Sequence, residues 1–255
     1  MLKTNNAYSY AQVPYITYEA LEVYAESIIG DYSPEMLITP GMIDIPGLVR
    51  DYLGLRVIFH RLSYDSKIAG ITVFGNDYIQ IWDKQAASVI PIPIEAGTVV
   101  IDSSLRCTRN QPRMRFTLGH EGSHWLLHQR AFSRDNPGNN AGIGVNNSLA
   151  AKTGAIKYSR GIWQTESEKK RMEHQADFLS AALLMPRPVL WVAYRSFFSR
   201  LGESPRLLIR GKGSSDDGTA KQLSAYIAAV FGVSNHAAMI RLEKLKAIEY
   251  RGVRR

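Results

Sequence analysis

The centre of this chain reads Arg115-Phe116-Thr117-Leu118-Gly119-His120-Glu121-Gly122-Ser123-His124-Trp125-Leu126-Leu127-His128. It contains the pattern H-E-x-x-H, in which His120 and His124 are four residues apart. Residues four apart lie on one face of an α-helix, so both imidazoles can reach one metal ion, typically Zn²⁺. Glu121 would take a proton from a water molecule bound to that zinc. The segment therefore predicts a zinc hydrolase that needs a third protein ligand.

The surroundings of this motif favour a buried helix. We expect the helix to run from about Arg113 to Arg130, because Pro112 precedes it and large apolar residues flank the motif. Such a helix is too apolar for an exposed surface position. Its polar face would be reserved for the metal.

His128 continues the four-residue spacing of the two histidines but is a poor third ligand. At the rise of an α-helix, His120 and His128 lie about 12 Å apart along the axis. We expect His128 to support the site from outside the ligand set. The longer pattern H-E-x-x-H-x-x-G-x-x-H is absent, because position 127 is Leu and position 130 is Arg.

Other candidates for the third ligand lie elsewhere in the chain. They are several carboxylates and the histidines at positions 60, 174 and 236. Glu173 is the best placed, since it lies on an apolar helix that must pack against something, and a carboxylate there is costly unless paired or bound to metal. An ion pair with Lys169 or Arg171 on the same helix is the competing interpretation.

Composition and charge set the broad class of protein. The chain has 255 residues, of which 45% are hydrophobic, enough for one large domain or two small ones. The net charge of +8 suits an anionic partner such as DNA, and equally an ordinary soluble surface. The single cysteine, Cys107, excludes an intrachain disulfide framework and suits a reducing compartment; we expect it to be buried at a strand end.

The chain shows no signal for export or membrane insertion. Residues 1–8 contain no apolar core of a signal peptide, and no run of about 18 apolar residues occurs anywhere. We therefore expect a cytoplasmic protein that does not interact with membranes.

Hydrophobic periodicity predicts an α+β fold. Two helices, at 17–32 and 43–53, lead into strands that we expect to form a small antiparallel sheet. These strands are 55–62, 68–74 and 99–101, with a further strand at 77–82 by alternation. Residues 87–97 contain prolines and give no clear pattern.

Later segments read as helices around a long polar insert. Residues 133–165 are rich in Gly, Asn and Ser, and form either a flexible surface insert or a lid beside a cleft. The expected helices are 166–185, 189–201, 223–231 and 234–248, with a flexible connection at 210–218. The last two form a helix-turn-helix arrangement, with Ser234 as N-cap.

Two blocks of sequence together resemble the ImmA/IrrE family of zinc metallo-endopeptidases. The first is the central segment, similar to the family pattern R-F-T-L-A-H-E-x-x-H-x-L-L-H. The second, similar to E-x-x-A-N-x-F-A-A-x-L-L-M-P, reads Glu173-His174-Gln175-Ala176-Asp177-Phe178-Leu179-Ser180-Ala181-Ala182-Leu183-Leu184-Met185-Pro186. A weaker resemblance extends from Ile43 to about Leu245.

The resemblance implies a complete site. It makes His120, His124 and Glu173 the ligands of Zn²⁺, and Glu121 the general base that later passes its proton to the leaving amine. Asp177 stands where the family usually has Asn, and we expect it to orient a histidine. The chain also departs from the family at Gly119 and at Gly122-Ser123, where Ala and Leu-Gly are common.

The resemblance also implies domains and a substrate. We expect an N-terminal extension in residues 1–40, a zincin-like metallopeptidase domain in 41–200 containing the insert, and a C-terminal helical region in 201–255 packed on it. The implied substrate is an intracellular regulatory protein, such as a phage or mobile-element repressor.

The alternative function is a metal-bound transcriptional regulator with little protease activity. Residues 222–242 have helix-turn-helix spacing, and basic residues from Arg241 onward make the tail of the chain basic. The same segment recurs in the helical region of the peptidase family, so contact with DNA is the weaker expectation. Intact ligands and Glu121 argue against a scaffold that has lost activity.

Overall fold

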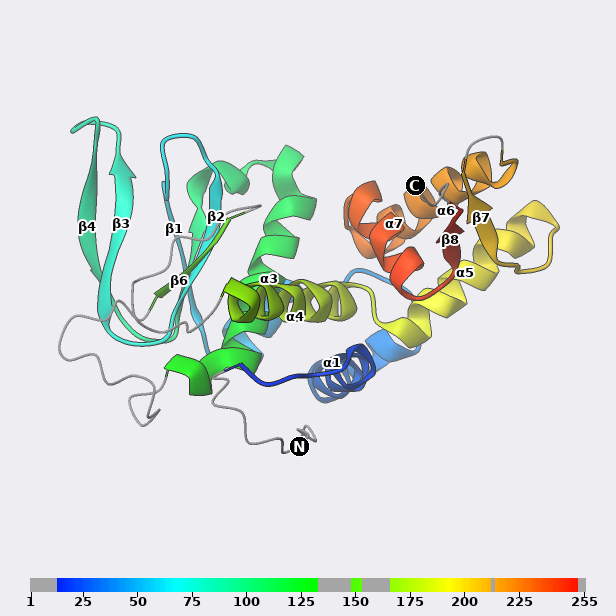
Figure 1. Ribbon diagram of the computed structural model, residues 1–255, viewed down its shortest axis with the longest axis horizontal. Coiled ribbons are helices and arrows are strands. Elements are labelled where there is room, and N and C mark those ends of the chain that lie inside the picture. The colour runs from blue at the N-terminus through cyan, green and yellow to red at the C-terminus, as the bar shows by residue number, and fades with distance from the viewer. Residues whose placement is uncertain (1–12, 133–147, 153–165, 212–213, 252–255) are drawn as a thin grey trace. The chain divides into compact units, whose positions relative to one another are not determined.

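The computed structural model describes residues 13–132, 148–152, 166–211 and 214–251, and these confirm the α+β class (Figure 1). They form two compact units: the first contains the described residues up to 21 and between 44 and 180, and the second those between 22 and 43 and from 181 onward. Two of the three boundaries fall inside helices, α1 (Tyr18–Tyr32) and α4 (Glu166–Leu184), and the units differ from the three consecutive ranges expected from the sequence. Contacts between distant segments define the units, and such contacts leave no mark in local composition.

Helix length and hydropathy show which described helices could cross a membrane. In the described part of the chain no single helix has the length and apolar character to cross a bilayer, although two bent pairs meet those criteria together.

The sheet of the first unit is mixed, so the expectation of an antiparallel sheet was wrong. Its strand order is β1-β5-β2-β6, with β1 parallel to β5 and the other two pairs antiparallel. The strands are β1 (Arg56–His60), β2 (Ile68–Val73), β5 (Thr98–Asp102) and β6 (Ser148–Lys152). A hairpin between β2 and β5 returns the chain to the centre of the sheet, where every residue of β5 is buried. Sequence alternation identifies strands but not this pairing order.

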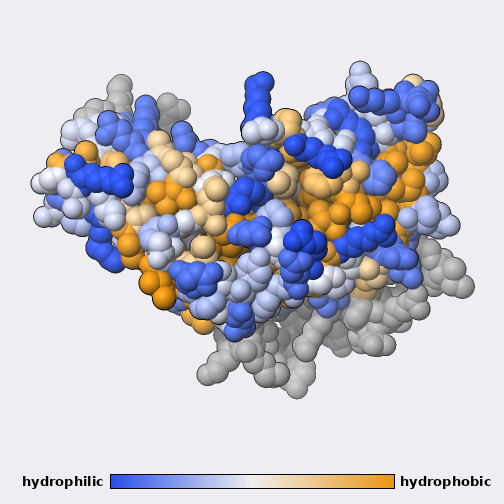
Figure 2. All heavy atoms as spheres, turned by 180° about the vertical axis from the view of Figure 1, so that it is seen from behind, coloured by the Kyte–Doolittle hydropathy of each residue, from blue (hydrophilic) through white to orange (hydrophobic). Residues whose placement is uncertain are grey.

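The hairpin consists of β3 (Asp77–Asp83) and β4 (Ser88–Ile94), and β4 was missed because of its prolines. Pro91 and Pro93 are two residues apart, so their missing N–H groups lie on one side of the strand, away from β3. The isoleucines that alternate with these prolines, Ile90, Ile92 and Ile94, are partly buried and pack against the hydrophobic core. Ile58 of β1 and Ile68 of β2 pack against the same core. Figure 2 shows hydrophobic side chains that reach the molecular surface.

Helix α3 (Gln111–Phe132) carries the motif and packs against β2, β5 and α2 (Ile45–Gly47), which continues as the short π-helix η2 (Leu48–Tyr52). Two glycines allow close approach. A Cβ at Gly119 would lie 2.8 Å from Ser180 Oγ of α4, and one at Gly122 would lie 3.2 Å from Val49 Cγ2. Close packing therefore accounts for glycine at positions 119 and 122.

Part of the predicted insert is a strand. Residues 148–152 form β6, which pairs with β2, whereas the rest of 133–165 lies outside the described residues. Both interpretations of the insert, a flexible surface insert and a lid, therefore stay predictions.

The second unit contains the predicted helix-turn-helix arrangement. Its helices are α5 (Arg187–Leu201), α6 (Asp216–Phe231) and α7 (Asn235–Lys244), with the short 3-10 helix η1 (Pro34–Leu37). The Ser234 side chain accepts a 3.1 Å hydrogen bond from the Ala237 N–H, which confirms the predicted N-cap. Helix α7 ends at Lys244, earlier than expected. The residues that follow form β8 (Ile248–Tyr250), which pairs in parallel with β7 (Leu208–Arg210).

Arg241 is buried in this unit and does not contribute to a basic surface. Its guanidinium makes a bidentate ion pair with the carboxylate of Glu22, itself 3% exposed, and also donates to the Met185 carbonyl oxygen. The side chain therefore joins α1, the end of α4 and α7. The expectation that Arg241 adds to a basic tail was wrong, because its side chain is buried.

Removing one partner of this ion pair should be costly. We expect Glu22→Ala to lower the free energy of unfolding by about 3–5 kcal/mol, because it leaves the guanidinium buried without a counter-charge. Urea unfolding measures this loss. The double variant Glu22→Leu/Arg241→Met serves as the control and should recover most of the stability; equal losses in both variants would contradict a dominant charge effect.

Candidate metal centre

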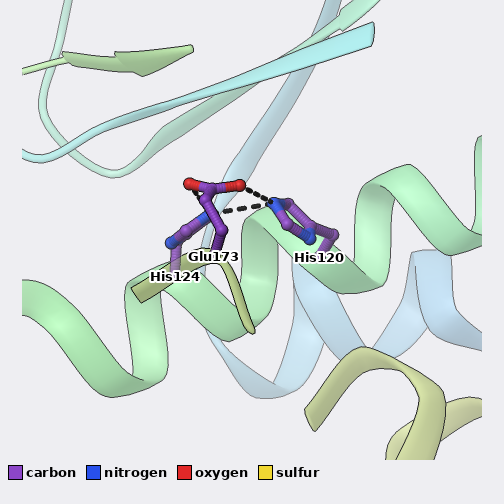
Figure 3. A group of neighbouring side chains, drawn as sticks. All are labelled: His120, His124 and Glu173. Atoms are coloured by element: carbon purple, nitrogen blue, oxygen red, sulfur yellow. Dashed lines mark hydrogen bonds and ion pairs between the residues drawn. The ribbon is translucent and has the colours of Figure 1, made fainter. Parts of the chain in front are cut away.

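Three side chains from two helices converge on one point in the first unit (Figure 3). His120 and His124 project from α3, and Glu173 reaches them from α4. Their nearest nitrogen atoms, both Nε2, are 2.9 Å apart, and each lies 3.4 Å from an oxygen of the Glu173 carboxylate. The structure thus brings together the ligand set inferred from the resemblance.

These donor atoms fit a metal ion. Ligands at about 2.0–2.1 Å from a tetrahedral zinc lie about 3.3 Å from one another. The three donor atoms in the cluster all lie within 4.8 Å of one another, and both histidines are buried. Two imidazoles and a carboxylate suit zinc chemically, so the cluster can hold such an ion.

The charges in the cluster are coupled. Burial lowers the pKa of His120, but hydrogen bonds to Asp177 and Glu173 outweigh it and raise the pKa to about 10. Burial and the neighbouring His120 lower the pKa of His124. Burial opposes ionisation of Glu173, yet hydrogen bonds to the two histidines lower its pKa. A proton is therefore favoured where a metal cation would stand, and metal binding would displace it.

Glu121 lies beside the cluster with its carboxylate half satisfied. Its side chain is fully buried, and Oε2 accepts a 2.6 Å hydrogen bond from the Thr72 hydroxyl of β2. The other oxygen, Oε1, has no hydrogen-bond partner among the described residues. Burial raises the pKa of this carboxyl to about 7, although His120 and Thr72 oppose the shift. An unpartnered buried carboxylate oxygen is costly, so this position calls for an explanation.

Gly70 makes room for this carboxylate. A Cβ at Gly70 would lie 2.6 Å from Glu121 Oε1 and 2.9 Å from Thr117 Cγ2. Only a residue without a side chain leaves β2 close enough for Thr72 to hold Glu121. Gly70 and Thr72 were not identified from the sequence; a glycine inside a strand pattern is the signal that could have indicated the close approach.

Further contacts orient the two histidines. Asp177 Oδ1 lies 2.8 Å from His120 Nδ1, as expected for an orienting carboxylate. His128 lies outside the ligand cluster, and its Nδ1 is 3.1 Å from His124 Nδ1. Its Nε2 lies 3.1 Å from Oε1 of Gln175, a residue that the sequence reasoning did not select.

The other histidines considered as a third ligand are not part of this cluster. Among the described residues, it comprises only His120, His124 and Glu173. Lys169 and Arg171 lie 3.4 Å from Glu166 and 3.8 Å from Glu168, so the expected alternative partners of Glu173 have carboxylates of their own. Cys107 is exposed after the 3-10 helix η3 (Ser103–Arg106), so the expectation that it is buried was wrong.

Comparison with protein-family models finds no match, and comparison with curated proteins finds no significant relative.

Removing the third ligand should abolish tight metal binding. We expect purified wild-type protein to carry about one zinc per chain and Glu173→Ala to lose it, because two histidines alone make an incomplete site. Elemental analysis after dialysis measures the content. Glu166→Ala is the matched control, since Glu166 lies on the same helix with 72% of its side chain exposed. Full zinc occupancy in Glu173→Ala would exclude Glu173 as a ligand.

Filling the space beside Glu121 should destabilise the fold. We expect Gly70→Ala to lower the free energy of unfolding by about 1–3 kcal/mol, because the new methyl group overlaps Glu121 and Thr117. Urea unfolding of the metal-free protein measures it. Gly41→Ala is the control, as a Cβ there meets no atom within 4 Å. Equal stability of the two variants would argue against the close approach of β2 and α3.

Proposed function

We propose that this protein is a zinc-dependent endopeptidase that hydrolyses a peptide bond in an intracellular regulatory protein. The observation that carries the proposal is the Glu121 carboxylate, buried beside three potential ligands with one oxygen held and the other free. The sequence resemblance to ImmA/IrrE peptidases supports the same assignment.

His120, His124 and Glu173 would hold the zinc ion. Zinc bound by such ligands lowers the pKa of a coordinated water to about 7 and polarises a carbonyl group. Asp177 and His128 keep the two imidazoles in place through their Nδ1 atoms. The buried position of both ligands limits the access of bulk water.

Glu121 would act as general base and then as general acid. Thr72 fixes Oε2, so Oε1 is the atom available to take a proton from the attacking water. The same atom would then deliver the proton to the leaving amine. A purely structural zinc site has no use for this carboxylate and usually has four protein ligands.

The resemblance indicates the kind of substrate. A phage or mobile-element repressor remains the proposed class, and such a target would place the protein in the cytoplasm. The alternative, a DNA-binding regulator with little protease activity, loses part of its support because Arg241 is buried against Glu22.

Replacing the general base separates hydrolysis from metal binding. We expect Glu121→Gln to keep about one zinc but to lower cleavage by about 10²–10⁴-fold, because the amide cannot accept the proton. The assay co-expresses each variant with repressors encoded beside the gene and looks for one discrete cut.

The controls of this experiment distinguish the candidate functions. Glu166→Ala should cleave as the wild type does, because Glu166 is exposed and lies outside the cluster. Undiminished cleavage by Glu121→Gln would exclude Glu121 as the base. A salt-dependent DNA complex formed equally by wild type and Glu121→Gln, without cleavage, would favour the regulator.

A further inference from the structure

A chain of hydrogen bonds leads from the segment before α1 to His124. Its members are the Pro14 carbonyl oxygen, Gln175, His128 and His124, all within the first unit. Gln175 is 4% exposed, His128 1% and His124 0%, so the two contacts among these three side chains are shielded from water, whereas the contact with Pro14 is part-buried. No known role in the proposed hydrolysis requires Gln175 or Pro14.

The direction of this chain is fixed at Pro14. A carbonyl oxygen can only accept, so the Gln175 amide nitrogen, 2.7 Å away, must donate to it. The amide oxygen of Gln175 then faces His128 Nε2 at 3.1 Å and must accept from it. Rotating the amide by half a turn would place two acceptors, the amide oxygen and the Pro14 carbonyl, against each other.

This direction is transmitted through both imidazoles. A neutral imidazole carries one N–H donor and one acceptor nitrogen. Since His128 donates from Nε2, its Nδ1 is the acceptor, and it receives the Nδ1–H of His124. His124 Nε2 is then left as a lone pair, and this is the atom that faces His120 and Glu173.

We propose that Gln175, anchored by the Pro14 carbonyl, is a positioning residue that sets the tautomers of His128 and His124 so that His124 presents Nε2 to a metal ion. The inference rests on the proposed zinc site and adds the N-terminal segment to it. With the opposite tautomers, the proton of His124 would lie on Nε2 and block the ligand atom.

The two histidine ligands are thus oriented by different chemistry. His120 contacts Asp177, a carboxylate whose side chain is 54% exposed and therefore solvated. At the buried His124 a second carboxylate would be costly to desolvate. A neutral amide that is itself fixed by a backbone carbonyl gives the same orientation without adding charge.

The first test reads the tautomers in the unmodified protein. In the zinc-loaded full chain, ¹⁵N chemical shifts of the histidine rings should show the Nε2–H form for His128 and the Nδ1–H form for His124. The Nδ1–H form at His128 would overturn the proposal. This result does not depend on whether a variant folds.

The second test measures zinc affinity of Gln175→Leu by competition with a chromogenic chelator. We expect the dissociation constant to rise by about 10–100-fold, as for other residues that orient metal-bound histidines. Ser180→Ala is the matched control, because it removes a buried hydrogen bond between α4 and the Phe116 carbonyl without touching the chain, and its affinity should stay within about threefold of wild type.

The outcomes separate the two proposals. Absence of zinc binding by the wild-type protein would overturn the metal site itself. Zinc binding that Glu173→Ala abolishes and Gln175→Leu leaves unchanged would overturn only the role of Gln175.

Discussion

Helix α3 packs so closely against β2, α4 and η2 that the contact points have no room for a side chain, and the whole site depends on this close packing. Three glycines permit it: Gly70 where β2 meets Glu121, Gly119 where α4 crosses, and Gly122 beside the π-helix η2. Each glycine within the helix costs about 1 kcal/mol relative to alanine, so packing must offset their intrinsic penalty. As a result, β2 and α4 can both place polar groups on one face of α3.

Charges largely withdrawn from solvent are neutralised in different ways at Glu173, Arg241 and Glu121. Glu173 faces the imidazoles of His120 and His124. It shares a proton with one of them or, as proposed, a metal ion with both. Arg241 is matched by a carboxylate and a carbonyl in the second unit. Glu121 receives a single hydroxyl donor, which leaves it the least satisfied of the three. The role in proton transfer proposed for Glu121 rests on that inequality.

Local patterns predicted much of the fold and the part of the site that lies on one helix. The α+β class, the motif helix and the Ser234 cap follow from periodicity and capping, which act over a few residues. Pairing of β1 with β5, and the contact of Thr72 with Glu121 across 49 residues, depend on how the chain returns to itself. No short-range pattern encodes such contacts.

The burial of Arg241 illustrates the same limit. From the sequence it is one basic residue among several near the end of the chain, whereas its partner Glu22 is far away at the other end. Charge counts describe composition and do not distinguish a guanidinium in the core from one in solvent. Glu173 was assigned by resemblance rather than by periodicity for the same reason, since its partners lie on another helix.

The position of β6 bears on how an extended peptide could reach Glu121. Strand β2, which carries both Gly70 and Thr72, is paired with β5 on one side and with β6 on the other. Residues 70–73 of β2 are therefore paired on both sides. A peptide that bound by strand addition would have to align along the outer edge of β6 or take its place.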